Sequence, residues 1–429
     1  MSKHPVARII ERHKRGEPAG IYSVCSANPS VLKAAMDRAK RTGSHLLIEA
    51  TCNQVNQFGG YTGLTPQAFL NYTQDLASQT EFPPDQLILG GDHLGPSVWQ
   101  GEPPDQAMAK AEDLMRAYVA AGFSKIHLDA SMSCQGDPIP LPDTTVAERA
   151  ARLCRVAEET SGGAGSQVYV IGTEVPVPGG THETLDELQV TTPDEVAMTI
   201  SNARSSFEAL GLERAWERVI AVVVQPGVEF GTDSVVNYRR EAAVDLSRTI
   251  EQYPGLVYEA HSTDYQPGSA LRELVEDHFC ILKVGPWLTF AFREAVFALA
   301  MIEDELSKGR SQHTVSSLLN VIESTMLTQP QYWKKYYEGD EAEQRLQRRF
   351  SLSDRIRYYW SNPEISHALE AMLKNLTSID IPLTLVSQYL PQQYEAIRRG
   401  EIDCSPQVLI RHRIQEVLNL YGSACGESS

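Results

Sequence analysis

The chain has 429 residues, of which 42% are hydrophobic and 22% are charged, and its formal net charge is −17. The length suits one large α/β barrel with an appended segment. The acidic balance argues against a general nucleic-acid binder, because the phosphate backbone would be repelled. No apolar run is long enough to cross a bilayer, so we expect no membrane association.

The N-terminal segment MSKHPVARIIERHKRGEPAG predicts a short amphipathic helix that ends near Gly16, within an extension of residues 1–18. It lacks an apolar core followed by a small-residue cleavage site, so we expect no secretory signal. The seven cysteines are scattered and form no C-x-x-C pair. This argues against a disulfide framework and against a structural zinc cluster, and it favours a cytoplasmic protein.

Between residues 19 and 310, eight short β-rich segments alternate with longer segments of helical spacing. Pro29, Pro66, Pro103 and Pro193 lie where helices should begin, a position that tolerates a missing N–H group. Eight strand–helix pairs predict a (β/α)8 TIM barrel. A doubly wound sheet is the alternative, and the first strand is not followed by G-x-G-x-x-G. The segments are IYSVCSAN (21–28), HLLIEAT (45–51), LILGGDH (87–93), KIHLDAS (125–131), VYVIGTE (168–174), VIAVVVQPG (219–227), LVYEAHS (256–262) and FCILKVGP (279–286).

The remaining part, residues 311–429, has mostly helical spacing, as in VSSLLNVIESTM, HALEAMLKNL and LIRHRIQEVLNLY. It follows the hinge-like segment SKGRSQ. We therefore expect a helical C-terminal subdomain appended to the barrel.

Polar residues gather at the predicted C-terminal ends of the strands, which build the active site in this kind of barrel. Period-two alternation puts His127, Asp129 and Ser131 on one face of their strand, and Glu259 and His261 on one face of theirs. Charged groups inside a barrel are costly unless they are paired or hold a metal. The set therefore favours a site, and an ion-pair network that fixes the barrel is the structural alternative.

The segment LILGGDHLG (87–95) offers the first candidates for chemistry. His93 suits a divalent metal through a neutral imidazole, and Asp92 beside it could act as general acid or base. His261 adds an imidazole from another strand, and Glu174 adds a carboxylate that could serve as ligand or base. The structural alternative is a capping aspartate and a buried histidine.

Other residues suit the binding of a sugar or a phosphate. Gly179 and Gly180 could offer backbone amides to an anion or form a plain turn, and Lys283 could bind phosphate or pair with a carboxylate. The amides of TCNQVNQFGGYTG suit sugar hydroxyls or a solvated loop. In SLSDRIRYYW the arginines suit phosphate, although an exposed salt-bridged helix face is the interpretation we favour. The candidates for substrate contacts are Asn28, Glu49, Asn53, Gln54, Asp129, Gly179, Gly180, Gln225, Asp264, Lys283, Arg355 and Tyr358.

Several motifs together carry a resemblance to a known family over nearly the whole chain. They are IYSVCSANP, NQVNQFGGYTG, DHLGP, IHLDASMSC, GTEVPVPGG, VVVQPGVEFG, YEAHSTDYQ, LKVGP, PQYWKKYY, FSLSDRIRYYW and SQYLPQQ. The chain resembles the Z-type subunit of class II tagatose-1,6-bisphosphate aldolase. The resemblance implies a TIM barrel that associates with a catalytic Y-type subunit in galactitol and N-acetylgalactosamine breakdown. A tagatose 6-phosphate kinase label also used for this family finds no support, because no G-x-x-x-x-G-K-[ST] motif occurs.

The Z-type subunit is in turn similar to the catalytic class II aldolases, whose site the resemblance carries over. It implies proton transfer by Asp92, zinc binding by His93 and His261, and a strand-five glutamate at Glu174 followed by Gly179 and Gly180.

This sequence also departs from the catalytic aldolases. Their sixth-strand histidine is replaced by Gln225-Pro226-Gly227, so Glu229 or Glu259 would have to complete the metal site. Their glycine-rich phosphate loop is replaced by Ser262-Thr263-Asp264, which argues against ordinary bisphosphate aldolase activity.

Two functional hypotheses follow. The first, implied by the resemblance, is an accessory subunit needed for full activity and stability of the catalytic subunit in tagatose 6-phosphate catabolism. The alternative is a divalent-metal enzyme, best fitted to zinc, that epimerises a ketose or ketose 6-phosphate at C4 by retro-aldol chemistry. Its substrate would be a phosphorylated ketohexose, and the chain could also form a homo-oligomer.

Overall fold

Eight parallel strands form a closed barrel in the computed structural model, which describes residues 3–163, 165–172, 188–308 and 315–427. The strand order around the barrel is β1-β10-β9-β6-β5-β4-β3-β2, and β1 closes it by pairing with β10. This arrangement confirms the predicted TIM barrel and excludes the open doubly wound sheet. The barrel strands are β1 (Ile21–Val24), β2 (Leu46–Thr51), β3 (Leu87–Leu94), β4 (Lys125–Leu128), β5 (Val168–Gly172), β6 (Val219–Val223), β9 (Val257–Ala260) and β10 (Ile281–Val284).

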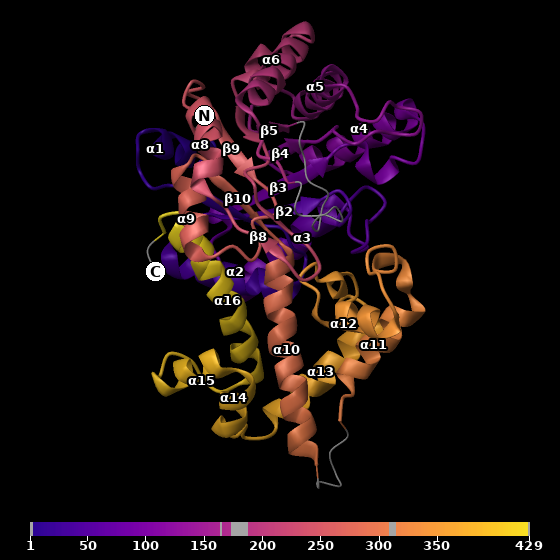
Figure 1. Cartoon of the computed structure of the whole chain (residues 1–429), viewed down its shortest axis with the longest axis vertical. Coiled ribbons are helices and arrows are strands. Elements are labelled where there is room, and N and C mark those ends of the chain that lie inside the picture. The colour runs from indigo at the N-terminus through magenta and orange to yellow at the C-terminus, as the bar shows by residue number, and fades with distance from the viewer. Residues whose placement is uncertain (1–2, 164, 173–187, 309–314, 428–429) are drawn as a thin grey trace.

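Helices between the strands surround the barrel (Figure 1). Proline occupies the first position of α2, α3 and α6, as the sequence predicts, while α4 begins one residue after Pro103. Thr192 completes a capping box at the start of α6. The helices are α2 (Pro29–Thr42), α3 (Pro66–Thr80), α4 (Pro104–Ala120), α5 (Asp143–Thr160), α6 (Pro193–Ala209), α7 (Glu213–Trp216), α8 (Arg240–Ile250) and α9 (Gly268–Glu276).

The N-terminal helix α1 (Pro5–Lys14) closes the end of the barrel where the strands begin. Val6 and Ile10 pack in one apolar cluster with Ile21, Leu47 and Ile88, which lie at or next to the first residues of their strands. The interior near α1 is therefore apolar, and the polar residues of the barrel lie toward the end where the strands finish.

The segment after β6 contains a feature that the sequence pattern did not predict. Strands β7 (Glu229–Phe230) and β8 (Val235–Val236) form a small antiparallel pair before α8. Two-residue strands are too short to produce a recognisable alternation of apolar and polar residues.

Helix α10 (Pro286–Ser307) starts at the barrel mouth and extends away from it into the C-terminal helices (Figure 1). The last helix, α16, packs against α10 and returns to pack against both α9 and α2. Helix α16 thereby lies between α9 and α2 in the outer ring of helices. The C-terminal helices are α11 (Leu318–Thr328), α12 (Glu341–Phe350), α13 (Pro363–Thr377), α14 (Leu383–Tyr389), α15 (Pro391–Arg398) and α16 (Pro406–Ala424).

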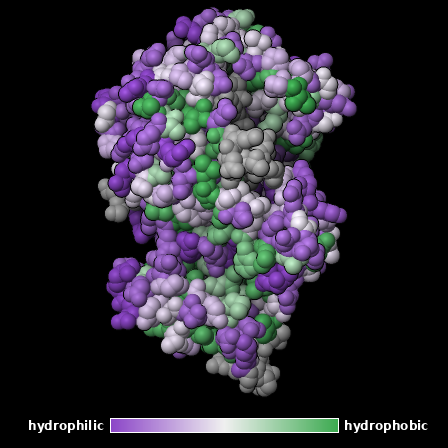
Figure 2. Space-filling model, in the orientation of Figure 1, coloured by the Kyte–Doolittle hydropathy of each residue, from purple (hydrophilic) through white to green (hydrophobic). Residues whose placement is uncertain are grey.

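The surface is mostly hydrophilic over the outer helices, with hydrophobic residues along the middle of the face seen in Figure 2. In the described parts of the chain, no helix is both long and apolar enough to cross a membrane.

Candidate functional site

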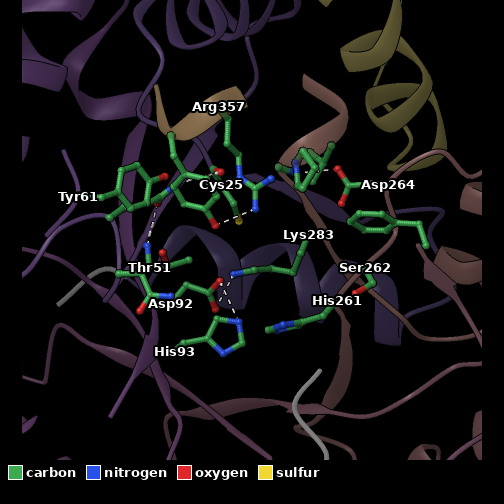
Figure 3. A pocket seen from close by; sticks show the side chains of 17 residues that line it. Cys25, Thr51, Tyr61, Asp92, His93, His261, Ser262, Asp264, Lys283 and Arg357 are labelled. Atoms are coloured by element: carbon green, nitrogen blue, oxygen red, sulfur yellow. Dashed lines mark hydrogen bonds and ion pairs between the residues drawn. The ribbon is translucent and has the colours of Figure 1, made fainter. Parts of the chain in front are cut away.

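A pocket opens at the C-terminal ends of the strands, between the barrel and the short 3-10 helix η5 (Arg355–Tyr358) of the C-terminal region. Asp92 and His93 reach it from β3, His261 from the end of β9, and Lys283 from β10 (Figure 3). Side chains that are far apart in the sequence therefore meet at one end of the barrel. Its other lining residues include Cys25, Thr51, Asn53, Gln54, Tyr61, Asp264, Arg357 and Tyr358.

Three imidazoles stand in a nearly equilateral triangle, and two of them, those of His93 and His261, line this pocket. The ring centroids of His93 and His127 are 5.2 Å apart, those of His93 and His261 are 5.0 Å apart, and those of His127 and His261 are 5.2 Å apart. His127, on β4, was recognised in the sequence as inward-facing but was not proposed as a ligand. Its period-two spacing from Asp129 in KIHLDAS was the available signal.

Each of the three imidazoles uses one ring nitrogen to contact a carboxylate. The pairs are His93 Nδ1 with Asp129 Oδ2 at 2.8 Å, His127 Nδ1 with Asp92 Oδ1 at 2.9 Å, and His261 Nε2 with Glu259 Oε1 at 3.0 Å. The other nitrogen of His127, Nε2, is buried and has no hydrogen-bond partner among the described residues. Histidines that bind a metal typically hold a carboxylate with the second ring nitrogen, which fixes the ring and raises its basicity.

The donor set fits a divalent cation. Ligand atoms of Asp92, His127, Glu259 and His261 all lie within 4.8 Å of one another, and all four residues are buried. Neutral imidazole and carboxylate ligands suit zinc and similar metals. Nε2 of His127 has no partner among the residues that the structure describes, which a purely structural cluster leaves unexplained, because a buried polar atom without a partner is costly.

His127, on β4, is thus a third imidazole that the resemblance did not supply. Among the described residues the donor group includes the predicted ligand His261 but not the predicted ligand His93. Of the two replacements considered, Glu259 belongs to the cluster. Glu229 does not, because it lies in β7, where its Oε1 accepts a hydrogen bond from the backbone N–H of Phe230. Burial raises the pKa of Glu229 to about 7.

Below the imidazoles lies a layer of buried ion pairs. Lys125 is fully buried and contacts Glu49 at 2.6 Å and also Glu259. Lys283 contacts Glu49, and its Nζ lies 3.0 Å from Asp92 Oδ1. The network that was the structural alternative is thus present, and it shares Asp92 and Glu259 with the imidazole cluster. Glu49 is buried within it and does not line the pocket.

These neighbours set the charge states of the site. Burial alone would raise the pKa of Asp92, but His93 and Lys283 outweigh it and hold that pKa well below its usual range. Burial opposes the charge on Lys283, yet Asp92 and the nearby carboxylates raise its pKa well above the usual value. Burial lowers the pKa of His261 to about 4, so its ring is neutral near pH 7. The site therefore holds a carboxylate, an ammonium and a neutral imidazole side by side.

The glycines of LILGGDHLG make room for this arrangement. A Cβ on Gly90 would come within 2.7 Å of the Glu49 side chain, and a Cβ on Gly95 would lie 1.5 Å from the Asp129 carbonyl oxygen. His93 adopts a φ of +50°, a left-handed conformation that is rare outside glycine. Backbone strain of this kind clusters at functional sites.

Of four residues that we predicted to contact substrate, two form hydrogen bonds with the protein backbone and two line the pocket. Asn28 caps α2 by accepting hydrogen bonds from Ser30 and Val31, and Gln225 accepts from Gly227 and Val228. Asn53 and Gln54 both line the pocket. The remaining predicted residues of the strand-five loop lie outside the described part of the chain: Glu174, Gly179 and Gly180.

The segment SLSDRIRYYW is not the exposed salt-bridged helix that we favoured. Arg355 is only 3% exposed and lies 3.1 Å from the centroid of the Tyr336 ring. The segment is drawn inward because Asp354 pairs with Arg293 at 2.9 Å and accepts a hydrogen bond from Thr289. The pocket is lined by Tyr358, as predicted for substrate binding, and by Arg357 instead of Arg355.

Comparison of the chain with known proteins identifies a protein family that it matches over nearly its whole length. The model of the family described as D-tagatose-1,6-bisphosphate aldolase subunit GatZ/KbaZ-like matches residues 6–426. The chain is similar to a probable tagatose 6 phosphate kinase from Sinorhizobium meliloti 1021, with 48% identity over 95% of this chain and 100% of that chain and a TM-score of 0.88.

Two aldolases are far less similar to the chain. The YdjI aldolase from Escherichia coli K12 shares 13% identity over 87% of this chain and 96% of that one, with a TM-score of 0.43. The fructose-bisphosphate aldolase from Campylobacter jejuni shares 13% identity over 86% and 90%, with a TM-score of 0.44. Similarity at this level supports no conclusion about chemistry.

Proposed function

We propose that this chain, which belongs to the GatZ/KbaZ-like family of D-tagatose-1,6-bisphosphate aldolase subunits, is itself a metal-dependent enzyme that epimerises a ketose phosphate at C4. The observation that carries the proposal is the triangle of imidazoles, each held by a carboxylate, two of which line a pocket at the barrel mouth. A subunit that only stabilised a partner would not need a buried His127 Nε2 that has no hydrogen bond to any described residue.

His127 and His261, together with Asp92 and Glu259, form the donor group that would hold the divalent cation, and His93 would complete the triangle of imidazoles beside it. When bound, such a cation supplies Lewis-acid polarisation of a ketose carbonyl. The chain's own residues would do the rest. The ionised Asp92 lines the pocket and is placed to accept the proton of the C4 hydroxyl. The Lys283 ammonium, 3.0 Å from Asp92, orients that carboxylate and stabilises negative charge near it.

The reaction balances without a further reactant. The C3–C4 bond breaks as its electron pair moves toward the C2 carbonyl, and the C4 hydroxyl proton passes to Asp92. The aldehyde fragment rotates, the bond forms again on its opposite face, and Asp92 returns the proton. The product is the C4 epimer. Glu174, from the loop outside the described residues, is a second candidate for the proton transfer.

The test combines metal content with product analysis. The purified chain should bind about one divalent ion and interconvert D-tagatose 6-phosphate and D-fructose 6-phosphate. His127→Ala should reduce both the bound metal and the turnover, by at least about 100-fold in turnover, because it removes a ligand. His367→Ala, an exposed histidine on α13, is the matched control and should change neither. A metal-loaded wild-type chain that forms no epimer would overturn the proposal.

The second candidate is an accessory role, and the family description as an aldolase subunit favours it. The chain would then bind a catalytic Y-type subunit and raise its stability and activity in tagatose 6-phosphate catabolism. The two functions separate cleanly. His127→Ala should keep the ability to raise aldolase activity of the partner if the role is accessory, and it should lose epimerase activity if the chain is an enzyme.

The related Sinorhizobium meliloti protein is called a probable tagatose 6 phosphate kinase. We do not extend that activity to this chain, since the sequence has no G-x-x-x-x-G-K-[ST] motif for a P-loop.

A further inference from the structure

The carboxylate of Asp264 occupies the start of helix α10 at the rim of the pocket (Figure 3). Its Oδ1 accepts hydrogen bonds from the backbone N–H groups of Gly285 at 3.0 Å and Trp287 at 2.8 Å. The helix is 22 residues long, so its N-terminus carries the partial positive charge that attracts anions. Asp264 therefore fills, with its own carboxylate, the place that a ligand anion would otherwise take.

The charge on Asp264 matters to any ligand in the pocket. Burial raises the pKa of Asp264 to about 6, against the two backbone N–H groups that favour the ionised form. Near pH 7.5 the group is mostly ionised. A second anion brought to this rim would meet a buried like charge and would find two of the helix N–H groups already bound.

Arg357 lines the same pocket and is a positive neighbour of Asp264. Across the described residues, no carboxylate lies within 4.0 Å of its guanidinium. The guanidinium is held by backbone carbonyls of Ser353 and Asp354, by the hydroxyl of Tyr358 at 3.0 Å and by the ring of Tyr358, whose centroid is 4.5 Å away. Lys283, by contrast, already contacts three carboxylates.

Among the described residues, the pocket thus has one cation that forms no ion pair with a carboxylate, and one carboxylate that occupies a helix N-terminus. We propose that it selects a ketose with a single anionic group, a phosphate monoester bound by Arg357, and that Asp264 excludes a second phosphate. The arginine fork matches phosphate oxygens in a way that a fixed lysine does not. This inference rests on the proposed function for its substrate class and adds which residues read the charge.

Equilibrium binding tests it without turnover. The full chain would be titrated at pH 7.5 with D-tagatose, D-tagatose 6-phosphate and D-tagatose 1,6-bisphosphate. Wild type should bind the monophosphate at least about 10-fold more tightly than either of the others. Arg357→Gln should weaken monophosphate binding by about 10- to 100-fold and leave the unphosphorylated sugar unchanged.

Asp264→Asn keeps the oxygen that accepts from the helix and removes the charge. This variant should bind the bisphosphate about 10-fold more tightly than wild type, with monophosphate binding within about 3-fold. Arg248→Gln, whose side chain in wild type is 73% exposed, is the matched control and should bind all three sugars like wild type. Thermal unfolding checks that each variant folds, and Arg357→Lys, which keeps the charge, should retain part of the phosphate preference.

Bisphosphate binding as tight as monophosphate binding in wild type, or wild-type affinity in Arg357→Gln, would overturn the inference. The outcomes for the proposed function are separate. Monophosphate binding through Arg357 with no epimer formed would leave the inference standing and remove the epimerase. Epimer formation by the wild type, with unchanged monophosphate binding in Arg357→Gln, would support the epimerase and overturn this inference.

Discussion

Asp129 is not in the group of possible metal ligands, but it holds the imidazole of His93. It is buried, its Oδ2 holds His93 Nδ1 at 2.8 Å, and its Oδ1 accepts from the hydroxyl and backbone N–H of Ser131. The carboxylate is thus fixed from both sides and in turn fixes the His93 ring. The strain at His93, with φ at +50°, makes that support necessary.

We expect Asp129→Asn to weaken metal binding by about 10- to 100-fold, because His93 loses its orienting charge. Competition with a metal-responsive dye would measure the affinity. Asp113→Asn, on the exposed face of α4, is the control and should bind metal like wild type. Unchanged affinity in Asp129→Asn would mean that His93 does not support the metal site.

At the level of elements, β3 and the segment after it depend on close backbone approach. Gly95 lies against the Asp129 carbonyl oxygen, where an added Cβ would be 1.5 Å away. Gly101, a few residues later, has nothing within 4 Å of the equivalent position. The two glycines therefore form a matched pair in the same connection between β3 and α4.

Gly95→Ala should lower the free energy of unfolding by about 3 kcal/mol or more, since backbone must shift to relieve the clash. Gly101→Ala should change it by no more than about 0.5 kcal/mol. Urea denaturation of both variants checks this. Equal stability of the two would show that β3 and β4 do not approach as closely as described.

Helix α1 is tied to the barrel by a pair of histidines. His13 Nε2 lies 2.8 Å from His278 Nδ1, and His13 Nδ1 lies 3.1 Å from the Ala19 carbonyl oxygen. Burial, with a smaller effect from His278, lowers the pKa of His13 from an ordinary 6.5 to about 4. Lys14 lies beside both histidines, and Glu251 and Asp277 lie beside His278, whose Nε2 is 3.4 Å from Glu251 Oε1.

The sign of the pH effect follows from this shift. Between about pH 6.5 and pH 4 the unfolded chain binds a proton at His13 that the folded chain does not. The contribution of His13 to the free energy of unfolding is therefore fully present above about pH 6.5 and is lost as the pH is lowered toward about 4. His13→Gln should make the melting temperature less dependent on pH over this window. An unchanged slope between pH 7 and pH 4.5 would contradict the account of α1.

The sequence predicted the strands and helices of the fold better than it predicted which side chains meet at the site. Short β-rich segments between stretches of helical spacing located all eight barrel strands, and period-two spacing placed His127 and Asp129 on one inward face. It could not assign His127 as a ligand, because that role depends on β4 lying beside β3 in the closed barrel. The sequence predicted Arg355 at the pocket, but Arg357, two residues later, lines it. The pattern could not show this, because the conformation at Asp354 is set by a tertiary ion pair with Arg293.

For the whole molecule, the C-terminal helices belong to both the fold and the site. Helix α16 packs against α9 and α2, and its Tyr421 donates a hydrogen bond of 2.7 Å to the carbonyl oxygen of Thr263 next to the pocket. The helix η5 brings Arg357 to the mouth. The division at residue 310 that the sequence suggests stays a prediction, and these contacts indicate strong coupling across it.

A fragment of residues 1–308 should therefore fail to fold stably, since it exposes the apolar faces of α2 and α9. The complete chain should unfold in one cooperative transition, with near-ultraviolet and far-ultraviolet circular dichroism coinciding. Two separated transitions would mean that the barrel and the C-terminal helices are independent units.

The central claim is that imidazoles from β4 and the end of β9, together with carboxylates from β3 and β9, hold one divalent cation at the barrel mouth. Anomalous X-ray diffraction from crystals of the zinc-loaded full chain tests it most directly. The account predicts one strong peak about 2.1 Å from ring nitrogens of His127 and His261. A map with no peak there, or with zinc bound only at surface histidines, would contradict it.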